Sequence, residues 1–244
     1  MRIAGLWVWA SVAFGGEPED IVALRQQRMA DSAPTLAASV YARALGGEMQ
    51  SGVEFVPGID SGKGWGVHVI NLPITALWKA ITDVDNLYRF IPVKHSQNLS
   101  GHRRTGLVAF QYLELPLVSD RWWCVQQRHN AGLYRSTSGR VWEMVFSDQH
   151  DKPACSADRL PKLSAEGMPV AWTRGGWMMV ALGEERTLVE YHVWTDPGGS
   201  LPTAQASRIA AMKVRDSLSG IERMARWELN RSDLGFTRPD GAAY

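Results

Sequence analysis

The chain has 244 residues, 45% of them apolar and 21% charged, which is the balance of a globular protein with a sizeable core. Its 26 basic and 25 acidic residues leave a formal charge of +1, and no long basic run occurs. Because nucleic-acid binding needs concentrated positive charge, this pattern argues against a nucleic-acid partner. The 11 tryptophans suit either a Trp-rich core or the lining of a cavity.

The first 16 residues resemble a secretory signal. Arg2 precedes an apolar run from Ile3 to Phe14 that ends in small residues, and the chain turns polar at Glu17. The run is too short to span a bilayer. We therefore expect residues 1–16 to be a signal peptide and the protein to be exported, periplasmic or secreted. The alternative is a buried N-terminal helix in a cytoplasmic protein.

Two helices are predicted over 17–28 and 34–45. The second has Pro34 in its first turn and stops at Gly46 and Gly47, and its apolar residues recur at helical spacing. Residues 17–50 are therefore interpreted as a helical extension that precedes the main domain.

Alternating apolar residues predict strands from Gly52 onward, first around Val53 and then around Val67. A helix opens at Pro73, with its apolar residues on one side, and ends at Asp83. Further strands are predicted over 93–99, 106–115, 121–129, 139–146, 170–182 and 186–195, with a polar loop over 147–169. Short turns between successive strands indicate an antiparallel meander.

A long amphipathic helix follows Pro202. Its apolar residues recur at steps of three and four and form one continuous face, namely Val214, Leu218, Ile221, Ala225 and Leu229. Residues 231–244 are rich in turn formers and are predicted to be a flexible tail.

Three motifs in this order resemble the START (StAR-related lipid-transfer) family. They are the Pro-containing turn and helix of 70–83, the turn of 116–121, and the turn Asp196-Pro-Gly-Gly-Ser-Leu-Pro202 before the last helix. The resemblance covers residues 51–230. It implies an α+β helix-grip fold, in which a curved antiparallel sheet wraps around a long C-terminal helix, within the superfamily that also holds polyketide cyclases.

The resemblance implies that a lipid or other apolar small molecule is bound in an internal cavity, without chemistry or a cofactor, by a monomer with at most transient membrane contact. Strand alternation places Arg121, Trp123 and Gln127 on one face, and Gln127 is the expected polar contact. The sterol-binding branch would have a cation there, so sterol specificity is not implied. The predicted ligand contacts are Phe110, Tyr112, Arg121, Trp123, Gln127, Trp142, Met144, Trp177 and Tyr191, any of which would serve equally as ordinary core.

Two other functions compete with a carrier. A cyclase-like enzyme would need an acid or base inside the cavity, and the candidates are Glu114, His129, Glu143, Glu190 and His192. Glu143 and Glu190 alternate with apolar neighbours and are expected to point to solvent. A scaffold whose tryptophans fill the cavity is the third class.

Metal and disulfide signals are weak. Asp148 and Asp151, with His150 between them and Cys155 nearby, are interpreted as solvated loop residues, so no metal is expected. Cys124 and Cys155 either pair in an oxidising compartment or are two unrelated buried thiols. Asp120 and Arg121 can form an ion pair across their turn.

Overall fold

The structure of the chain is a computed structural model that describes residues 17–59, 61–116, 118–149, 153–199, 203–231 and 237–243. The predicted signal peptide, residues 1–16, lies outside the described residues, as do His150 and Asp151 of the acidic loop.

Nine strands form one sheet, and along its main path every neighbouring pair is antiparallel. The order across that path is β1-β2-β9-β8-β6-β5-β4-β3, and the two-residue β7 pairs in parallel with β5. The bounds are β1 Gln50–Phe55, β2 Gly62–Ile70, β3 His95–His102, β4 Gly106–Leu113, β5 Arg121–His129, β6 Val141–Asp148, β7 Met168–Pro169, β8 Trp172–Ala181 and β9 Thr187–Asp196.

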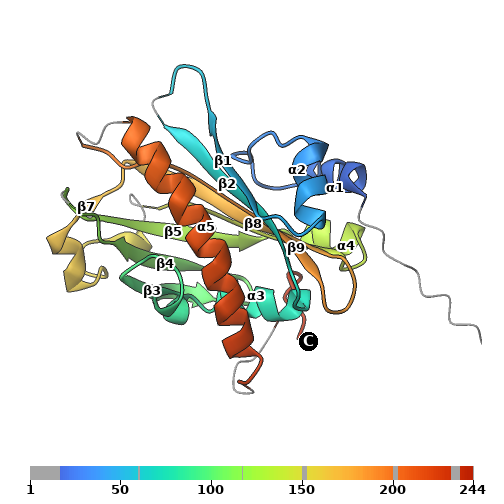
Figure 1. Ribbon diagram of the computed structural model, residues 1–244. Coiled ribbons are helices and arrows are strands. Elements are labelled where there is room, and N and C mark those ends of the chain that lie inside the picture. The colour runs from blue at the N-terminus through green and yellow to red at the C-terminus, as the bar shows by residue number, and fades with distance from the viewer. Residues whose placement is uncertain are drawn as a thin grey trace, which may run out of the picture.

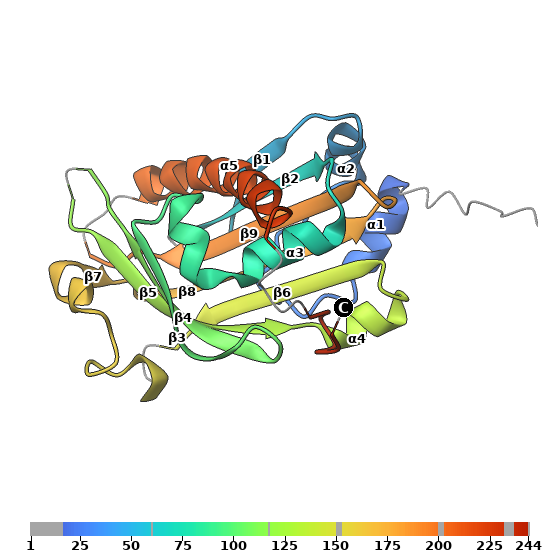
Figure 2. The same cartoon turned by 90° about the horizontal axis from the view of Figure 1, so that it is seen from below.

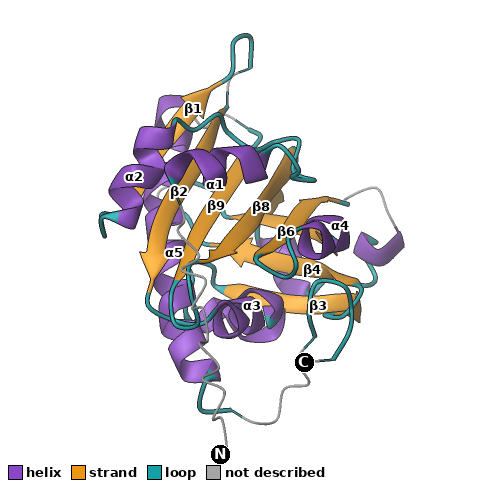
Figure 3. Cartoon of the chain, turned by 90° about the vertical axis from the view of Figure 1, so that its right-hand side faces the viewer, coloured by secondary structure: helices purple, strands orange, loops and turns teal. Residues whose placement is uncertain are grey.

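Helices cover both faces of the sheet. The α-helices are α1 Pro18–Arg25, α2 Ala38–Leu45, α3 Ile74–Thr82, α4 Ala131–Ser136 and α5 Thr203–Glu228; short 3-10 turns are η1 Val84–Arg89, η2 Pro153–Cys155 and η3 Lys162–Glu166. Helix α5 crosses one face diagonally with α3 beside it (Figures 1 and 2). Helices α1 and α2 lie over the opposite face, in front of β2 and β9 in Figure 3.

Each face of the sheet therefore has its own apolar core. Between the sheet and α3 and α5, Trp78 and Leu218 pack with Trp177 from the strands. On the other face, Tyr41 of α2 packs against Val67 of β2 and its neighbours. Burial on both faces explains why β6 and β8 have consecutive apolar residues, at 144–146 and 177–181, instead of strictly alternating.

Two glycines let α5 approach its neighbours closely. A Cβ atom added to Gly66 of β2 would lie 2.8 Å from Val214 and 2.7 Å from Leu218. One added to Gly220, in the middle of α5, would lie 2.3 Å from the carbonyl oxygen of Phe90. Since a side chain at either position would clash, the two glycines allow α5 to pack this closely against β2 and Phe90.

The strands and long helices largely follow the sequence prediction, with local differences. The second helix begins at Ala38, not Pro34, because the Thr35 N–H instead donates a 2.8 Å hydrogen bond to Glu54. Helix α4 was not predicted; the Asn130 side chain caps it by accepting from the Leu133 N–H. Leu229 is 55% exposed, so the apolar part of the buried face of α5 ends at Ala225.

Part of the predicted flexible tail packs against the main domain. Thr237 is buried, and its carbonyl oxygen accepts a 3.1 Å hydrogen bond from the indole N–H of Trp78 in α3. A bridge also pairs Thr237 with Ala243. The tail segment 237–243 is thus held at α3.

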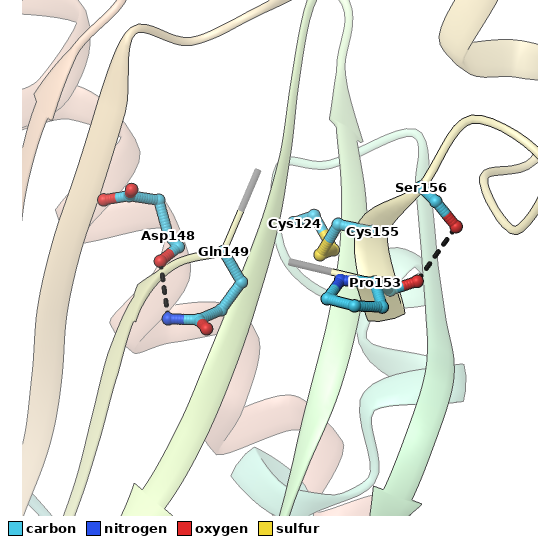
Figure 4. The surroundings of a disulfide bond; sticks show 6 residues. All are labelled: Cys124, Asp148, Gln149, Pro153, Cys155 and Ser156. Atoms are coloured by element: carbon cyan, nitrogen blue, oxygen red, sulfur yellow. Dashed lines mark hydrogen bonds between the residues drawn. A yellow bond between two sulfur atoms is a disulfide. The ribbon is translucent and has the colours of Figure 1, made fainter. Parts of the chain in front are cut away.

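A disulfide links Cys124 of β5 to Cys155 in η2, with 6.0 Å between the Cα atoms (Figure 4). Both cysteines are buried. The bond ties the long connection between β6 and β8 to the sheet. The Ser156 hydroxyl steadies the turn around it by donating a 2.9 Å hydrogen bond to the Pro153 carbonyl oxygen.

Candidate functional site

A pocket lies between α5, the α3–η1 segment and the face of the sheet that α5 crosses. The cavity itself has a volume of about 170 Å³. Most of the lining is apolar, and its larger members are Trp123, Met144, Phe146, Trp177, Tyr191 and Val193 from the strands and Ile81, Leu87, Ile209 and Ile221 from the helices. A lining of this kind suits an apolar small molecule.

Several polar side chains on the pocket wall hydrogen-bond to each other. The Trp123 indole N–H donates a 2.7 Å bond to Gln111, and the hydroxyl groups of Thr173 and Thr195 lie 2.6 Å apart. The Ser61 hydroxyl accepts from Trp194 at 2.9 Å. These pairs leave the wall with little unmet hydrogen-bonding capacity.

Gln127 differs from these residues. It lies on β5 opposite Phe146, lines the pocket and is 5% exposed. Its side-chain oxygen is buried without a hydrogen-bond partner in the described part of the chain. An unpaired buried amide costs about 1–3 kcal/mol, so this group has the free energy to gain from a polar ligand atom.

Six of the nine predicted ligand contacts line the pocket: Arg121, Trp123, Gln127, Met144, Trp177 and Tyr191. The rings of Trp177 and Tyr191, on neighbouring strands, stack with centroids 4.0 Å apart and form one wall. Their role as ligand contacts stays a prediction.

The other three predicted contacts lie outside the pocket lining. In the antiparallel register Gln111 is opposite Trp123, whereas Phe110 is opposite Cys124, so Phe110 and Tyr112 point to the other face of β4. Trp142 lies under α3, where it packs edge-on against Trp78. The prediction therefore placed the wrong face of β4 toward the pocket, because the register of β4 against β5 cannot be read from the sequence.

The predicted ion pair between Asp120 and Arg121 does not form; each side chain takes other partners. The Asp120 carboxylate accepts from the Tyr112 hydroxyl at 2.8 Å and from the Leu115 N–H at 2.9 Å, and these bonds hold its pKa below the usual value. The Arg121 guanidinium donates to backbone carbonyls of the turn before α5, at 2.6 Å to Pro197 and 3.1 Å to Gly198. Arg121 thereby fixes that turn.

The acids expected to point to solvent, Glu143 and Glu190, are instead fully buried on the face opposite the pocket. Arg28, which follows α1, reaches both: its Nε lies 2.8 Å from Glu143, and its Nη1 pairs with Glu190. Arg25 adds a 3.0 Å bond to Glu190. The N-terminal extension is thus held to the sheet by a buried ionic network of Arg25, Arg28, Glu143 and Glu190.

Neutral groups complete this ionic network. The Tyr41 hydroxyl donates to Glu190 at 2.7 Å, and the Asn130 amide donates to Glu143 at 2.8 Å. Burial alone would raise the pKa of Glu190, but the two arginines outweigh it and lower that pKa to about 2. Burial and the neighbouring Arg28 hold the pKa of His192 well below its usual value.

The sequence carries a signal for this network that strand alternation alone misses. Strand β6 reads Val-Trp-Glu-Met-Val-Phe, with apolar residues on both sides of Glu143. A strand that is apolar on both faces is buried on both, so an acid within it needs a buried cation.

None of the five acid–base candidates lines the pocket. Glu143, Glu190 and His192 lie on the face of the sheet opposite the pocket, and Glu114 pairs with Lys94 near the surface. His129 is half-buried, with its ring centroid 4.9 Å from that of Trp78, and desolvation lowers its pKa to about 4. The described residues contain no group of three side chains able to hold a metal ion. Nor is any described helix long and apolar enough to cross a membrane.

A long helix laid on a curved antiparallel sheet, with a pocket between the two, defines a protein of helix-grip fold. More particularly, the chain has the fold of START domains, as comparison with solved structures shows.

One such structure is a STAR-related lipid transfer protein fragment from Xanthomonas axonopodis, with a TM-score of 0.60 and 17% identity over 73% of this chain and 93% of that chain. Human STARD10 matches with a TM-score of 0.58 and 12% identity over 84% and 86% of the two chains. Human StAR-related lipid transfer protein 5 matches with a TM-score of 0.58 and 13% identity over 86% and 96%. No protein-family model and no curated protein matches the sequence.

Proposed function

We propose that the chain, as a monomer, binds a lipid or similar apolar molecule in the pocket and carries it without chemical change. The observation that carries the proposal is the pocket itself, apolar over most of its lining, with the buried amide of Gln127 on its floor. START-fold structures named as lipid transfer proteins support it by analogy. A cyclase-like reaction lacks its expected acids and bases, since none of the five candidates lines the pocket.

The free energy available from burial is sufficient for a carrier. A ligand that buries ~400 Å² of apolar surface gains ~10 kcal/mol at ~25 cal/mol per Å². Association and the ordering of the chain offset part of this gain, and micromolar binding needs about 8 kcal/mol net. Apolar contacts and one hydrogen bond at Gln127 thus suit reversible binding.

Native mass spectrometry of the protein purified from its own host, followed by lipid extraction, tests the proposal. We expect a co-purifying apolar molecule and uptake of lipid from a mixed pool by the delipidated protein. In Val193→Trp the indole would fill the pocket and abolish uptake, whereas Leu229→Trp places the same ring at an exposed position that follows α5 and should leave uptake intact. A protein that never takes up lipid would overturn the proposal.

We further propose transient contact between the pocket mouth and a membrane. Three exposed apolar residues are neighbours of lining residues: Phe55 pairs with Gly62, Met168 pairs with Arg121, and Met212 precedes Lys213 on α5. Because each would bury apolar area in the lipid interface, Phe55→Ser with Met168→Ser should slow ligand transfer between vesicles roughly tenfold. Solution affinity should not change, and Leu229→Ser is the control; unchanged transfer would exclude this surface.

We propose export on two grounds, the apolar run in residues 1–16 and the Cys124–Cys155 disulfide, which suits an oxidising compartment. Fractionation of the host with mass spectrometry of the mature N-terminus tests this. We expect a chain that begins close to Glu17 outside the cytoplasm, and an uncleaved cytoplasmic chain with two free thiols would contradict export.

A further inference from the structure

The charged side chains in the described lining of the pocket are both cations, Arg121 and Lys213. No aspartate or glutamate occurs among the described residues that line it. Charges of one sign inside apolar walls create a strong local potential, because the surroundings screen them poorly. The interior of this pocket is therefore electropositive.

Arg121 contributes to this potential as a fixed charge. It is 4% exposed, and its guanidinium bonds to backbone carbonyl oxygens of 119, 120, 197 and 198. Carbonyl partners satisfy the donors but carry no net charge. The positive charge of Arg121 thus persists beside the pocket, while its geometry is committed to the turn before α5.

Lys213 is the cation whose donors have no partner among the described residues. It belongs to a stripe at four-residue spacing on α5, Ile209, Lys213, Ser217 and Ile221, that lines the pocket. Its ammonium group makes no ion pair or hydrogen bond with any described residue, and Asp216, the next acid along the helix, does not pair with it. A half-buried ammonium without an acid partner has affinity left for an anion.

The position of Lys213 along α5 indicates which end of the pocket would hold the polar end of a ligand. Lys213 lies in the N-terminal half of α5, which is the half nearer to β7 in Figure 1. The C-terminal half of α5 runs beside α3, where Ile81 and Ile221 close the apolar end.

We propose that the ligand of the pocket is an acidic amphiphile. Its carboxylate or phosphate head binds the Lys213 ammonium group, and its apolar chain lies deeper, against Met144, Trp177 and Ile221. This inference rests on the proposed carrier function and adds the chemical class of the ligand.

The test compares hexadecanoic acid, hexadecyl phosphate and neutral methyl hexadecanoate, each below its micelle concentration, by calorimetric titration at low salt. We expect the wild-type protein to bind the two acidic ligands at least tenfold more tightly than the ester. Lys213→Met keeps the chain length and removes the charge, so affinity for the acids should fall at least tenfold while that for the ester is unchanged. Lys213→Arg should keep the preference.

Arg215→Met is the matched control, because it removes an equal charge from the exposed side of the same helix. We expect it to bind all three ligands as the wild type does. Equal wild-type affinity for acid and ester, or an acid preference that survives in Lys213→Met, would overturn this inference and leave the carrier function standing. Failure of all three ligands to bind would count against the carrier function itself. The tighter of the two acidic ligands identifies the head group.

Discussion

Gln127 and Gln111 lie on the neighbouring strands β5 and β4, and both line the pocket. Gln127 is buried on the floor of the pocket with an unpaired side-chain oxygen. The side-chain oxygen of Gln111 instead accepts a 2.7 Å hydrogen bond from the indole N–H of Trp123. The two glutamines thus differ in whether the protein itself provides a partner.

We therefore expect the same substitution to act in opposite directions at the two positions. Gln127→Leu removes an unpaired amide and should raise the free energy of unfolding by about 1 kcal/mol, while Gln111→Leu leaves the Trp123 N–H unpaired and should lower it by about 1–3 kcal/mol. Urea denaturation of the delipidated proteins measures both values. If Gln127→Leu destabilises as much as Gln111→Leu, the amide of Gln127 has a structural partner and is not reserved for a ligand.

Arg28 is the centre of the buried ionic network, because it bonds both Glu143 and Glu190 and its side chain is 2% exposed. Arg28→Met should lower the free energy of unfolding by about 3–5 kcal/mol, since two buried carboxylates lose their shared cation. Arg25→Met, which removes a partner of Glu190 alone, should cost less. Chemical denaturation checks the order of the two variants, and equal small losses would contradict it.

On the scale of the elements, the junction of α3 and α5 carries a further buried acidic group. Glu228, the last residue of α5, is fully buried, and its carboxyl group accepts no hydrogen bond from a donor among the described residues. Asp83, which ends α3, lies near it and is bonded by Asn86 at 2.8 Å and approached by Arg103 at 3.6 Å. Burial raises the pKa of Glu228 to about 7, together with a hydrogen bond from the protonated Glu228 carboxyl group to Asp83 and the negative charge of Asp83.

This shift makes the junction sensitive to pH. The folded state holds the Glu228 proton up to about pH 7, whereas the unfolded chain releases it near its ordinary value of about 4.5. The stabilising contribution of Glu228 is therefore full below about pH 4.5 and is lost as the pH rises to 7. Glu228→Gln should remove this dependence and be more stable than the wild type at pH 8 by about 2 kcal/mol.

Unfolding free energies of both proteins from pH 4 to pH 8 measure this effect. The difference between wild type and variant isolates Glu228, because the half-buried His129 changes the stability of both proteins equally. The pKa of His129 is lowered to about 4, so its stabilising contribution is lost as the pH falls below the usual histidine pKa of 6.5. A difference that stays constant with pH would show that Glu228 remains charged in the folded protein.

On the scale of the whole molecule, the Cys124–Cys155 disulfide closes a loop of the chain over a sequence separation of 31 residues. Cys124→Ala with Cys155→Ala should lower the free energy of unfolding by roughly 3–4 kcal/mol, because the unfolded chain regains the freedom of that loop. Reduction of the wild type should have the same effect, which differential scanning calorimetry measures. No loss from either treatment would mean that the bond is not formed.

The order of elements and the position of Gln127 on the same face of β5 as Arg121 and Trp123 were predictable from the sequence. Apolar periodicity and turn residues are local signals, so the bounds of β5 and the path of α5 could be read directly. The turn before α5 also behaves as predicted, with positive φ at Gly198 and Gly199.

What only the tertiary structure decided depends on residues far apart in the chain. The register of β4 against β5 turned Phe110 away from the pocket, and Arg28 found its two acids 115 and 162 positions along the chain. Lys213 faces the pocket instead of solvent because Gly66 and Gly220 fix where α5 sits on the sheet. Pairing across such distances follows from packing and from the register of the sheet, which local periodicity does not encode.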